Sequence, residues 1–286
     1  MTDSRQRIAL ITDSTSDMRD VASDNAIYVV PQIIIWGAEE LKDGVDITPE
    51  QFYRRLQTDD KHPTTSQPSA NHFAEVLRQA QSDGAEEALI ITLSKELSGT
   101  YDSAMQAVGM VDFPVTVVDS RSVSWGCAFQ VMAAHRVRQA GGDMQAMVAA
   151  ADHVRKTAII YLTLDTLEFL HKGGRIGGAA KLVGTALQLK PMLKVDPQDG
   201  RVEPVEKTRT RSKALQRLYE TFTATMDLSC PLHVAVMHGA APDLAEEFAN
   251  RVRTELNPVE LHVTQVASVI GVHTGPGAIA LCGYTE

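Results

Sequence analysis

Residues 93 to 101 read Leu93-Ser94-Lys95-Glu96-Leu97-Ser98-Gly99-Thr100-Tyr101 and join an expected strand to an expected helix. The apolar run 88–93 is typical of a buried strand, and a helical pattern begins near Tyr101. Because the first turn of a helix carries N–H groups without intrahelical partners, Ser98, Gly99 and Thr100 are suited to binding an anion there. A plain serine or threonine helix cap explains the same residues, and both interpretations stay open.

Apolar runs alternate with helical patterns on both sides of this junction. Such alternation predicts a parallel sheet that is covered by helices on both faces. Strands are expected at 8–12, 27–35, 88–93 and 115–118, and helices at 48–56, 69–84, 101–108 and 124–139, with another beginning after Asp143.

The pattern changes after the apolar run 158–164. Two strand-like runs, 189–195 and 201–206, flank an Asp199-Gly200 turn and indicate a β-hairpin, an antiparallel element not expected in the first half. Helices at 211–222 and 242–256 then alternate with strands at 232–237 and 260–266. We therefore expect an α/β fold of two domains, residues 1–160 with a parallel sheet and residues 161–286 with a second α/β unit.

The composition is that of an ordinary globular protein and argues against several function classes. Of the 286 residues 44% are hydrophobic, and the net charge of −9 argues against a general nucleic-acid binder. The cysteines Cys127, Cys230 and Cys282 are widely separated and predict neither a disulfide framework nor a zinc site. No apolar run approaches the roughly 18 residues of a membrane span. The polar stretch 2–7 and the short run 8–12 do not fit a signal peptide, so a cytoplasmic protein is expected.

Polar clusters in expected loops supply further candidate site residues. They are the hydroxyl cluster 64–69, which contains Thr65, the Asp13-Ser14-Thr15 end of the first strand, and His273 within the glycine-rich stretch 271–277. Open α/β sheets bind ligands at such strand ends, although a helix cap explains Asp13 equally well. The chain lacks the common phosphate-loop, dinucleotide-binding, zinc-protease and nucleophile-elbow motifs.

Two arginines are candidates for contact with an anion or an acidic partner. Arg175 lies among the glycines of 173–178, and Arg209 lies in the basic stretch 207–213 of an acidic chain. A guanidinium group matches carboxylate and phosphate geometry. A break between two helices explains the first position equally well, and a solvated helix face explains the second.

These segments together resemble the DegV family of bacterial fatty-acid-binding proteins, nearly from end to end. Each is short, but so many in the same order make a specific pattern. The matching segments are 11–15, 43–47, 65–69, 97–101, 118–120, 172–176, 190–191, 209–214 and 271–277.

The resemblance implies two α/β domains, the second with a mixed sheet, and one fatty acid buried between and within them. It places Thr65, Ser98 and His273 at the fatty-acid carboxylate, with Gly99 and Thr100 in the same turn. It places Arg175 and Arg209 near the pocket mouth, for contact with a partner or for phosphoryl transfer. It implies a non-catalytic, lipid-binding subunit of a fatty-acid kinase that feeds phospholipid synthesis, without a cofactor. The chain departs from the family at His171 and in the stretch 177–180, from which no function is inferred.

Physical chemistry agrees with that expectation. Each buried methylene group contributes about 0.8 kcal/mol, and a buried carboxylate must be hydrogen-bonded or neutralised. A tight ion pair would reduce the nucleophilicity of the carboxylate, so we expect no arginine or lysine beside it. Neither Arg175 nor Arg209 is therefore expected to contact the apolar tunnel.

Two alternative functions stay open at this point. A serine hydrolase could use Ser98, His273 and Asp119, although Glu96 occupies the place of the first glycine of a nucleophile elbow. A binder of phosphate or phospho-sugars could use the same hydroxyl and glycine turns.

Overall fold

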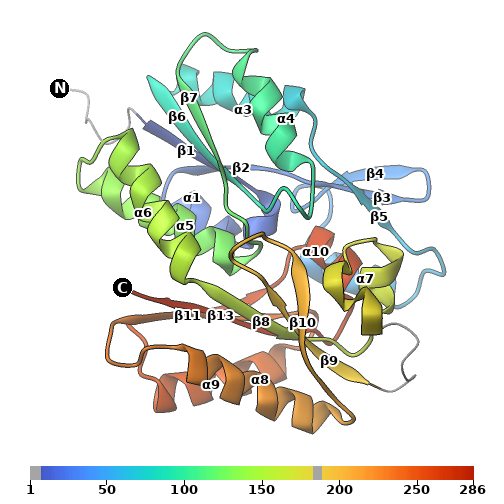
Figure 1. The fold of residues 1–286 in the computed structure, drawn as a ribbon. Coiled ribbons are helices and arrows are strands. Elements are labelled where there is room, and N and C mark those ends of the chain that lie inside the picture. Colours follow the sequence, from blue (N-terminus) through green and yellow to red (C-terminus); the bar gives the residue numbers. More distant parts are fainter. Residues whose placement is uncertain (1–7, 183–188) are drawn as a thin grey trace.

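A computed structural model describes residues 8–182 and 189–286, in which sheets and helices lie in layers (Figure 1). Four parallel strands form the first sheet, in the order β2-β1-β6-β7. Their bounds are β1 (Ile8–Asp13), β2 (Ile27–Val30), β6 (Glu87–Thr92) and β7 (Val115–Asp119). The parallel sheet predicted for the first half is confirmed, whereas the polar stretch 2–7 lies outside the described residues.

Two amphipathic helices cover the outer face of this sheet. They are α3 (Ala70–Ser82) and α4 (Thr100–Val108), and they run beside each other (Figure 1). Phe73 and Leu77 of α3 are fully buried against Ile11 and Ile90 of the sheet. The helical spacing of these apolar residues therefore predicts the face that α3 buries.

Six strands form the second sheet, in the order β10-β9-β8-β13-β11-β12. Their bounds are β8 (Ile159–Thr163), β9 (Lys190–Val195), β10 (Val202–Thr208), β11 (Leu232–His238), β12 (Glu260–Gln265) and β13 (Ile279–Thr285). β11 and β12 pair in parallel and the other neighbours pair antiparallel, so the sheet is mixed as expected. The predicted hairpin is β9–β10, and α8 (Arg211–Thr225) and α9 (Pro242–Glu255) cover the outer face (Figure 1).

Helices α5 (Trp125–Gln139) and α6 (Met144–Thr157) lie between the two sheets (Figure 1). Asp143 caps α6 as predicted, because its carboxylate accepts the Ala146 N–H at 2.9 Å. Phe129 of α5 belongs to one buried cluster with Leu10 of β1 and Tyr284 of β13. Since this core continues from one sheet to the other, the domain boundary near residue 160 stays a prediction.

A small antiparallel sheet lies beside the first sheet, in the order β4-β3-β5. It consists of β3 (Ile33–Trp36), β4 (Glu39–Lys42) and β5 (Thr64–Ser66). The expectation of one strand over 27–35 is wrong, because Pro31 and Gln32 separate β2 from β3 and a proline cannot donate to a strand ladder. The expectation that the first half has no antiparallel pairing is wrong as well.

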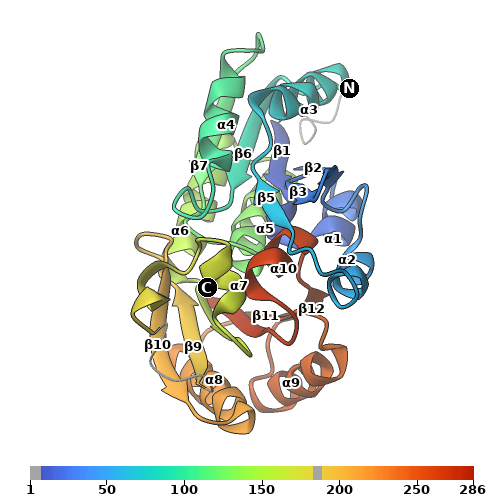
Figure 2. The ribbon, with the colours of Figure 1, turned by 90° about the vertical axis from the view of Figure 1, so that its right-hand side faces the viewer.

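Short helices lie in the connections between strands. They are a 3-10 turn (Ser14–Ser16), α1 (Arg19–Asp24), α2 (Pro49–Leu56), α7 (Glu168–Lys172), a second 3-10 turn (Gly177–Leu182) and α10 (Ser268–Thr274). α10 and β13 occur where no helix or strand was predicted. Figure 2 places α10 beside α7 and β5. Among the described residues no helix is both long and apolar enough to cross a bilayer, and the three cysteines are free thiols.

Candidate functional site

A cavity of about 100 Å³ lies between the two halves of the chain. Its wall is largely aliphatic, with polar side chains from loops, from β5 and from α10. The aliphatic wall includes Leu97, Val123, Leu162, Leu170, Val195 and Val269, and the polar wall includes Gln32, Thr65, Ser98, Arg175 and His273. Three of the residues singled out from the sequence, Thr65, Ser98 and His273, therefore border one space.

Thr65 and His273 form a hydrogen-bonded pair across the cavity wall. Thr65 lies in β5, which pairs with β3, and His273 lies in the last turn of α10. Thr65 Oγ1 is 2.9 Å from His273 Nε2. Burial, and next the positive charge of Arg175, lower the pKa of His273 to about 4. The imidazole is therefore neutral at pH 7 and acts as a hydrogen-bonding group instead of a cation.

Gly173 allows this histidine to take its place. A β-carbon at Gly173 would lie 2.0 Å from His273 Nδ1, closer than van der Waals contact permits. The glycine-rich stretch after α7 is thus a helix break, as one of the two interpretations held, and it also makes room for the imidazole.

Ser98 lies in the turn before α4, with Thr100 directly behind it. Ser98 Oγ and Thr100 Oγ1 are 2.8 Å apart, and Thr100 is fully buried. A β-carbon on Gly99 would meet the Gln67 side-chain oxygen at 2.2 Å, so Gly99 packs against Gln67. Of this predicted anion-binding turn, Ser98 borders the cavity, whereas the described lining does not include Gly99 or Thr100.

Arg175 borders the cavity as well. Its Nε donates to the Leu97 carbonyl at 3.0 Å and its Nη1 to the Gly173 carbonyl at 2.8 Å. Arg175 was expected not to contact the apolar tunnel, whereas the structure places it on the cavity wall. The reason is the reversal of the chain after α7, which turns Arg175 back toward Leu97.

Arg209 has a different setting. It follows the last residue of β10 and is exposed, and no ion pair of Arg209 occurs among the described residues. The neighbouring Arg211 has a structural role, because its guanidinium binds the Asp165 carboxylate at 2.5 Å and the Gly277 carbonyl at 2.6 Å. The basic stretch thus contains one arginine that fixes the glycine-rich turn and one that faces solvent.

The catalytic groups of a serine hydrolase are not assembled. Asp119 accepts the backbone N–H groups of Lys95 and Arg121 at 3.2 and 2.9 Å. His273 Nδ1, which a triad carboxylate would contact, is buried without a hydrogen-bond partner among the described residues. The partner of His273 Nε2 is Thr65, so the geometry disfavours this alternative.

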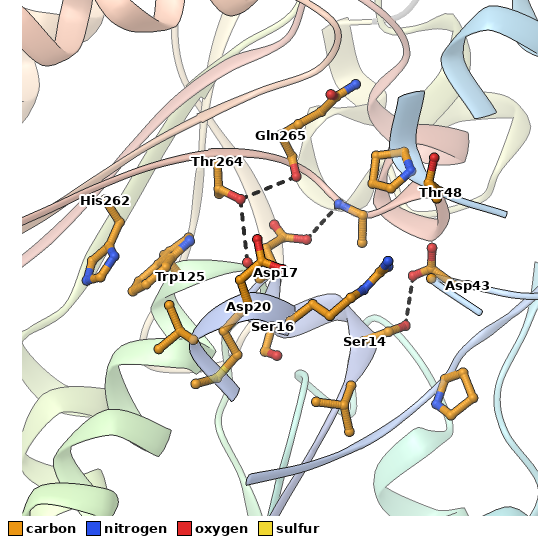
Figure 3. Close-up of a pocket in the computed structure, with 18 of the residues that line it drawn as sticks. Ser14, Ser16, Asp17, Asp20, Asp43, Thr48, Trp125, His262, Thr264 and Gln265 are labelled. Atoms are coloured by element: carbon orange, nitrogen blue, oxygen red, sulfur yellow. Dashed lines mark hydrogen bonds between the residues drawn. The ribbon is translucent and has the colours of Figure 1, made fainter. Parts of the chain in front are cut away.

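A second, larger cleft of about 570 Å³ lies where β1 and β2 end, opposite β12 (Figure 3). It is lined by polar residues of 14–20, by Asp43 and by Thr264 and Gln265. At one side the Trp125 ring stacks on His262, with centroids 3.7 Å apart. Among the described residues no cluster of three or more histidine, cysteine or carboxylate side chains could hold a metal ion.

Two carboxylates beside this cleft bind the start of α10. Asp17 Oδ1 accepts the Ala267 N–H at 2.7 Å, and Asp43 Oδ1 accepts the Ser268 N–H at 3.1 Å. Burial raises the pKa of Asp43 to about 6 and also raises the pKa of Asp17. Both residues belong to the first half of the chain, so these bonds fix the helix that carries His273 against that half. The sequence analysis did not find this role.

Comparison with known proteins agrees with the fold. The profile of a family described as "Uncharacterised protein, DegV family" matches residues 7–286. A DegV domain-containing protein of Streptomyces coelicolor is 38% identical over 279 residues, which is 96% of this chain and 98% of that protein.

Solved structures of similar proteins superimpose over almost the whole chain. One, described as fatty-acid binding of a DegV family protein from Thermus thermophilus, has a TM-score of 0.91 and 33% identity, covering 98% of this chain and 100% of that one. Another, a stearic-acid-binding protein from Eubacterium ventriosum, has a TM-score of 0.88 and 26% identity, covering 98% of each chain. On this sequence and structural evidence, the chain belongs to the DegV family.

Proposed function

We propose that this protein binds one long-chain fatty acid in the cavity between its two halves. The carboxylate interacts with Thr65, Ser98 and His273, and the acyl chain lies among the aliphatic side chains. The observation that carries the proposal is the composition of the cavity wall, in which hydroxyl groups and a neutral imidazole adjoin an aliphatic surface. The fatty-acid ligands of the similar structures support it.

The energetics of such a site favour a long chain. Each methylene group that leaves water contributes about 0.8 kcal/mol, so a long chain binds far more tightly than a short one. Arg175 adds positive charge near the carboxylate, while its hydrogen bonds to two backbone carbonyls hold its Nε and Nη1 on the wall.

We also infer that the bound carboxylate is presented to a partner kinase. A carboxylate oxygen would attack the γ-phosphoryl group of ATP held by that partner, which yields an acyl phosphate and ADP. In this scheme the protein is a lipid-binding subunit without turnover of its own, and its product enters phospholipid synthesis. The exposed Arg209 supports a role in the encounter, because its guanidinium is available to an acidic or phosphorylated surface.

Organic extraction of the purified protein, followed by mass spectrometry, tests the binding proposal. We expect a fatty acid of roughly C14 to C18, consistent with the free-energy gain per methylene. Delipidated protein should bind added palmitate, as measured by calorimetry. The absence of both an extracted lipid and palmitate binding would refute the proposal.

A fluorophosphonate probe tests the hydrolase alternative on the same sample. We expect Ser98 to stay unmodified, because His273 is bonded to Thr65 and Asp119 is bonded to backbone N–H groups. Labelling of Ser98 that is lost in His273→Ala would favour a hydrolase instead.

A further inference from the structure

A chain of hydrogen bonds leads from the buried end of β1 to the wall of the cavity. The Gln32 side-chain amide connects Asp13 to Thr100, since its Nε2 is 3.1 Å from Asp13 Oδ1 and 2.9 Å from Thr100 Oγ1. Thr100 Oγ1 is in turn 2.8 Å from Ser98 Oγ. Asp13, Gln32 and Thr100 are each at most 2% exposed, so water does not compete for these bonds.

Asp13 sets the direction of this series of hydrogen bonds, because the groups that contact its carboxylate oxygens are hydrogen-bond donors. Its carboxylate receives the Thr15 N–H at 3.0 Å, the Thr15 hydroxyl at 2.6 Å and the Leu93 N–H at 2.9 Å. Burial raises the pKa of Asp13, but these donors already occupy both of its oxygens as acceptors. Gln32 therefore directs its NH₂ group, and not its carbonyl oxygen, toward Asp13 Oδ1. The second hydrogen of that NH₂ group is then directed at Thr100 Oγ1.

The directions of the Thr100 and Ser98 hydroxyl hydrogens follow from the orientation of the Gln32 amide. Thr100 Oγ1 accepts from Gln32, and its own hydrogen has a good acceptor in Ser98 Oγ at 2.8 Å and a poor one in Gln32 Oε1 at 3.4 Å. When Thr100 donates to Ser98, the hydrogen of Ser98 is left free at the cavity wall. A carboxylate ligand, which only accepts, requires that hydrogen.

We propose that Asp13 and Gln32 are positioning residues that direct the Ser98 hydroxyl hydrogen into the cavity and thereby select a carboxylate ligand. This inference rests on the proposed function. An alcohol of the same chain length both donates and accepts, so it does not depend on the direction of that hydrogen. A purely structural network would affect the binding of the acid and of the alcohol alike.

Delipidated wild-type protein and Gln32→Met are compared in calorimetric titrations with tetradecanoic acid and with tetradecanol. Methionine keeps the length of the side chain and removes the amide. We expect acid binding to weaken about tenfold, as for a lost hydrogen bond to a charged group, and alcohol binding to change less than about twofold. Thr100→Val interrupts the same chain one step nearer the cavity and tests the proposal should Gln32→Met not fold.

Gln32 itself borders the cavity and could contact the ligand directly. A double variant with Ser98 distinguishes such a contact from an effect of Gln32 that acts through Ser98. In a Ser98→Ala background, Gln32→Met should cause no further loss of acid binding. Gln130→Met is the matched control, because Gln130 is a buried glutamine whose amide binds the Ser120 and Gly126 carbonyls.

Equal losses for acid and alcohol, or additive losses in the double variant, would overturn the positioning role. A wild-type protein that binds no acid would overturn the proposed function and this inference with it.

Discussion

At the scale of single residues, the cavity combines hydroxyl groups with an imidazole that carries no charge at pH 7. Thr65 and Ser98 each have one hydroxyl hydrogen, and the neutral His273 has one N–H. The bond between Thr65 and His273 uses one of these hydrogens. When His273 Nε2–H donates to Thr65, the hydroxyl hydrogens of Thr65 and Ser98 are both left for a carboxylate, which then needs no cation in direct contact. The carboxylate oxygens then keep more of their nucleophilic character than in a tight ion pair with an arginine.

Removing either hydroxyl should weaken fatty-acid binding by about 1–2 kcal/mol, because each variant deletes one hydrogen bond to a charged group. The variants are Thr65→Val and Ser98→Ala, and the measurement is palmitate titration of delipidated protein. Ser229→Ala, in an exposed turn before β11, is the control. Unchanged affinity in both cavity variants would place the carboxylate elsewhere.

The affinity for palmitate should stay constant between about pH 6 and about pH 8. Burial and Arg175 lower the pKa of His273 to about 4, so the ring is neutral through this whole interval. Titrations at several pH values test this, with His273→Gln as the reference that has no titrating ring. A fall in wild-type affinity toward pH 8 that the variant lacks would mean that the complex contains a protonated His273.

At the scale of elements, α10 contributes His273 to the cavity wall but depends on the other half of the chain. Its seven residues include a glycine and β-branched side chains, so local propensity gives it little stability. Asp17 and Asp43 bind the two backbone N–H groups at its start. The position of His273 thus follows from carboxylates more than two hundred residues away in the sequence.

Replacing Asp43 by asparagine should change how the stability of the protein depends on pH. The folded-state pKa of Asp43 is raised to about 6 from an ordinary value of 3.8, so the folded protein keeps a proton that the unfolded chain releases. Below about pH 4, Asp43 makes its full contribution to the free energy of unfolding. This contribution is lost as the pH rises toward 6, and the free energy of unfolding falls by at most about 1.4 kcal/mol per pH unit.

Urea unfolding of wild type and Asp43→Asn across this interval measures the difference. The free energy of unfolding of the wild type, relative to the variant, should fall between about pH 4 and about pH 6 and then level off. Asp24→Asn, at an exposed position of α1, is the control. A difference that is independent of pH would refute the raised pKa.

Local sequence signals account for much of the fold and for part of the site. The buried strands of the first sheet and the hairpin β9–β10 follow from their apolar runs and turn residues. By contrast, α10 is defined by contacts between distant segments, which no local pattern contains. The role proposed for Gln32 was not predicted from the sequence either, although Pro31 and Gln32 interrupt the apolar run 27–35 and indicate a break in the strand.

At the scale of the whole molecule, the cavity lies where the two halves meet. Thr65 and Ser98 come from the first half, and Arg175 and His273 come from the second. The arginines that were expected to act together are separated by this arrangement, because Arg175 borders the cavity and Arg209 is exposed at the end of β10. Their effects on lipid binding and on hand-off to a kinase should therefore differ.

Arg175→Glu should weaken fatty-acid binding at least about tenfold, because a second carboxylate would stand beside that of the ligand. Arg209→Glu should leave fatty-acid affinity within about threefold, yet sharply slow acyl-phosphate formation when kinase and ATP are supplied at saturating lipid. The wild-type rate should fall as added salt screens the encounter.

The decisive comparison is lipid affinity against phosphorylation rate in the same variants. Arg78→Glu makes the same charge change on α3, on the outer face of the first sheet, and should alter neither quantity. If Arg78→Glu slowed phosphorylation as much as Arg209→Glu, the effect would reflect net charge instead of a docking site. If Arg209→Glu reduced binding and phosphorylation in parallel, Arg209 would belong to the lipid site. Slow phosphorylation with intact binding, confined to Arg209→Glu, would locate the kinase contact at the end of β10.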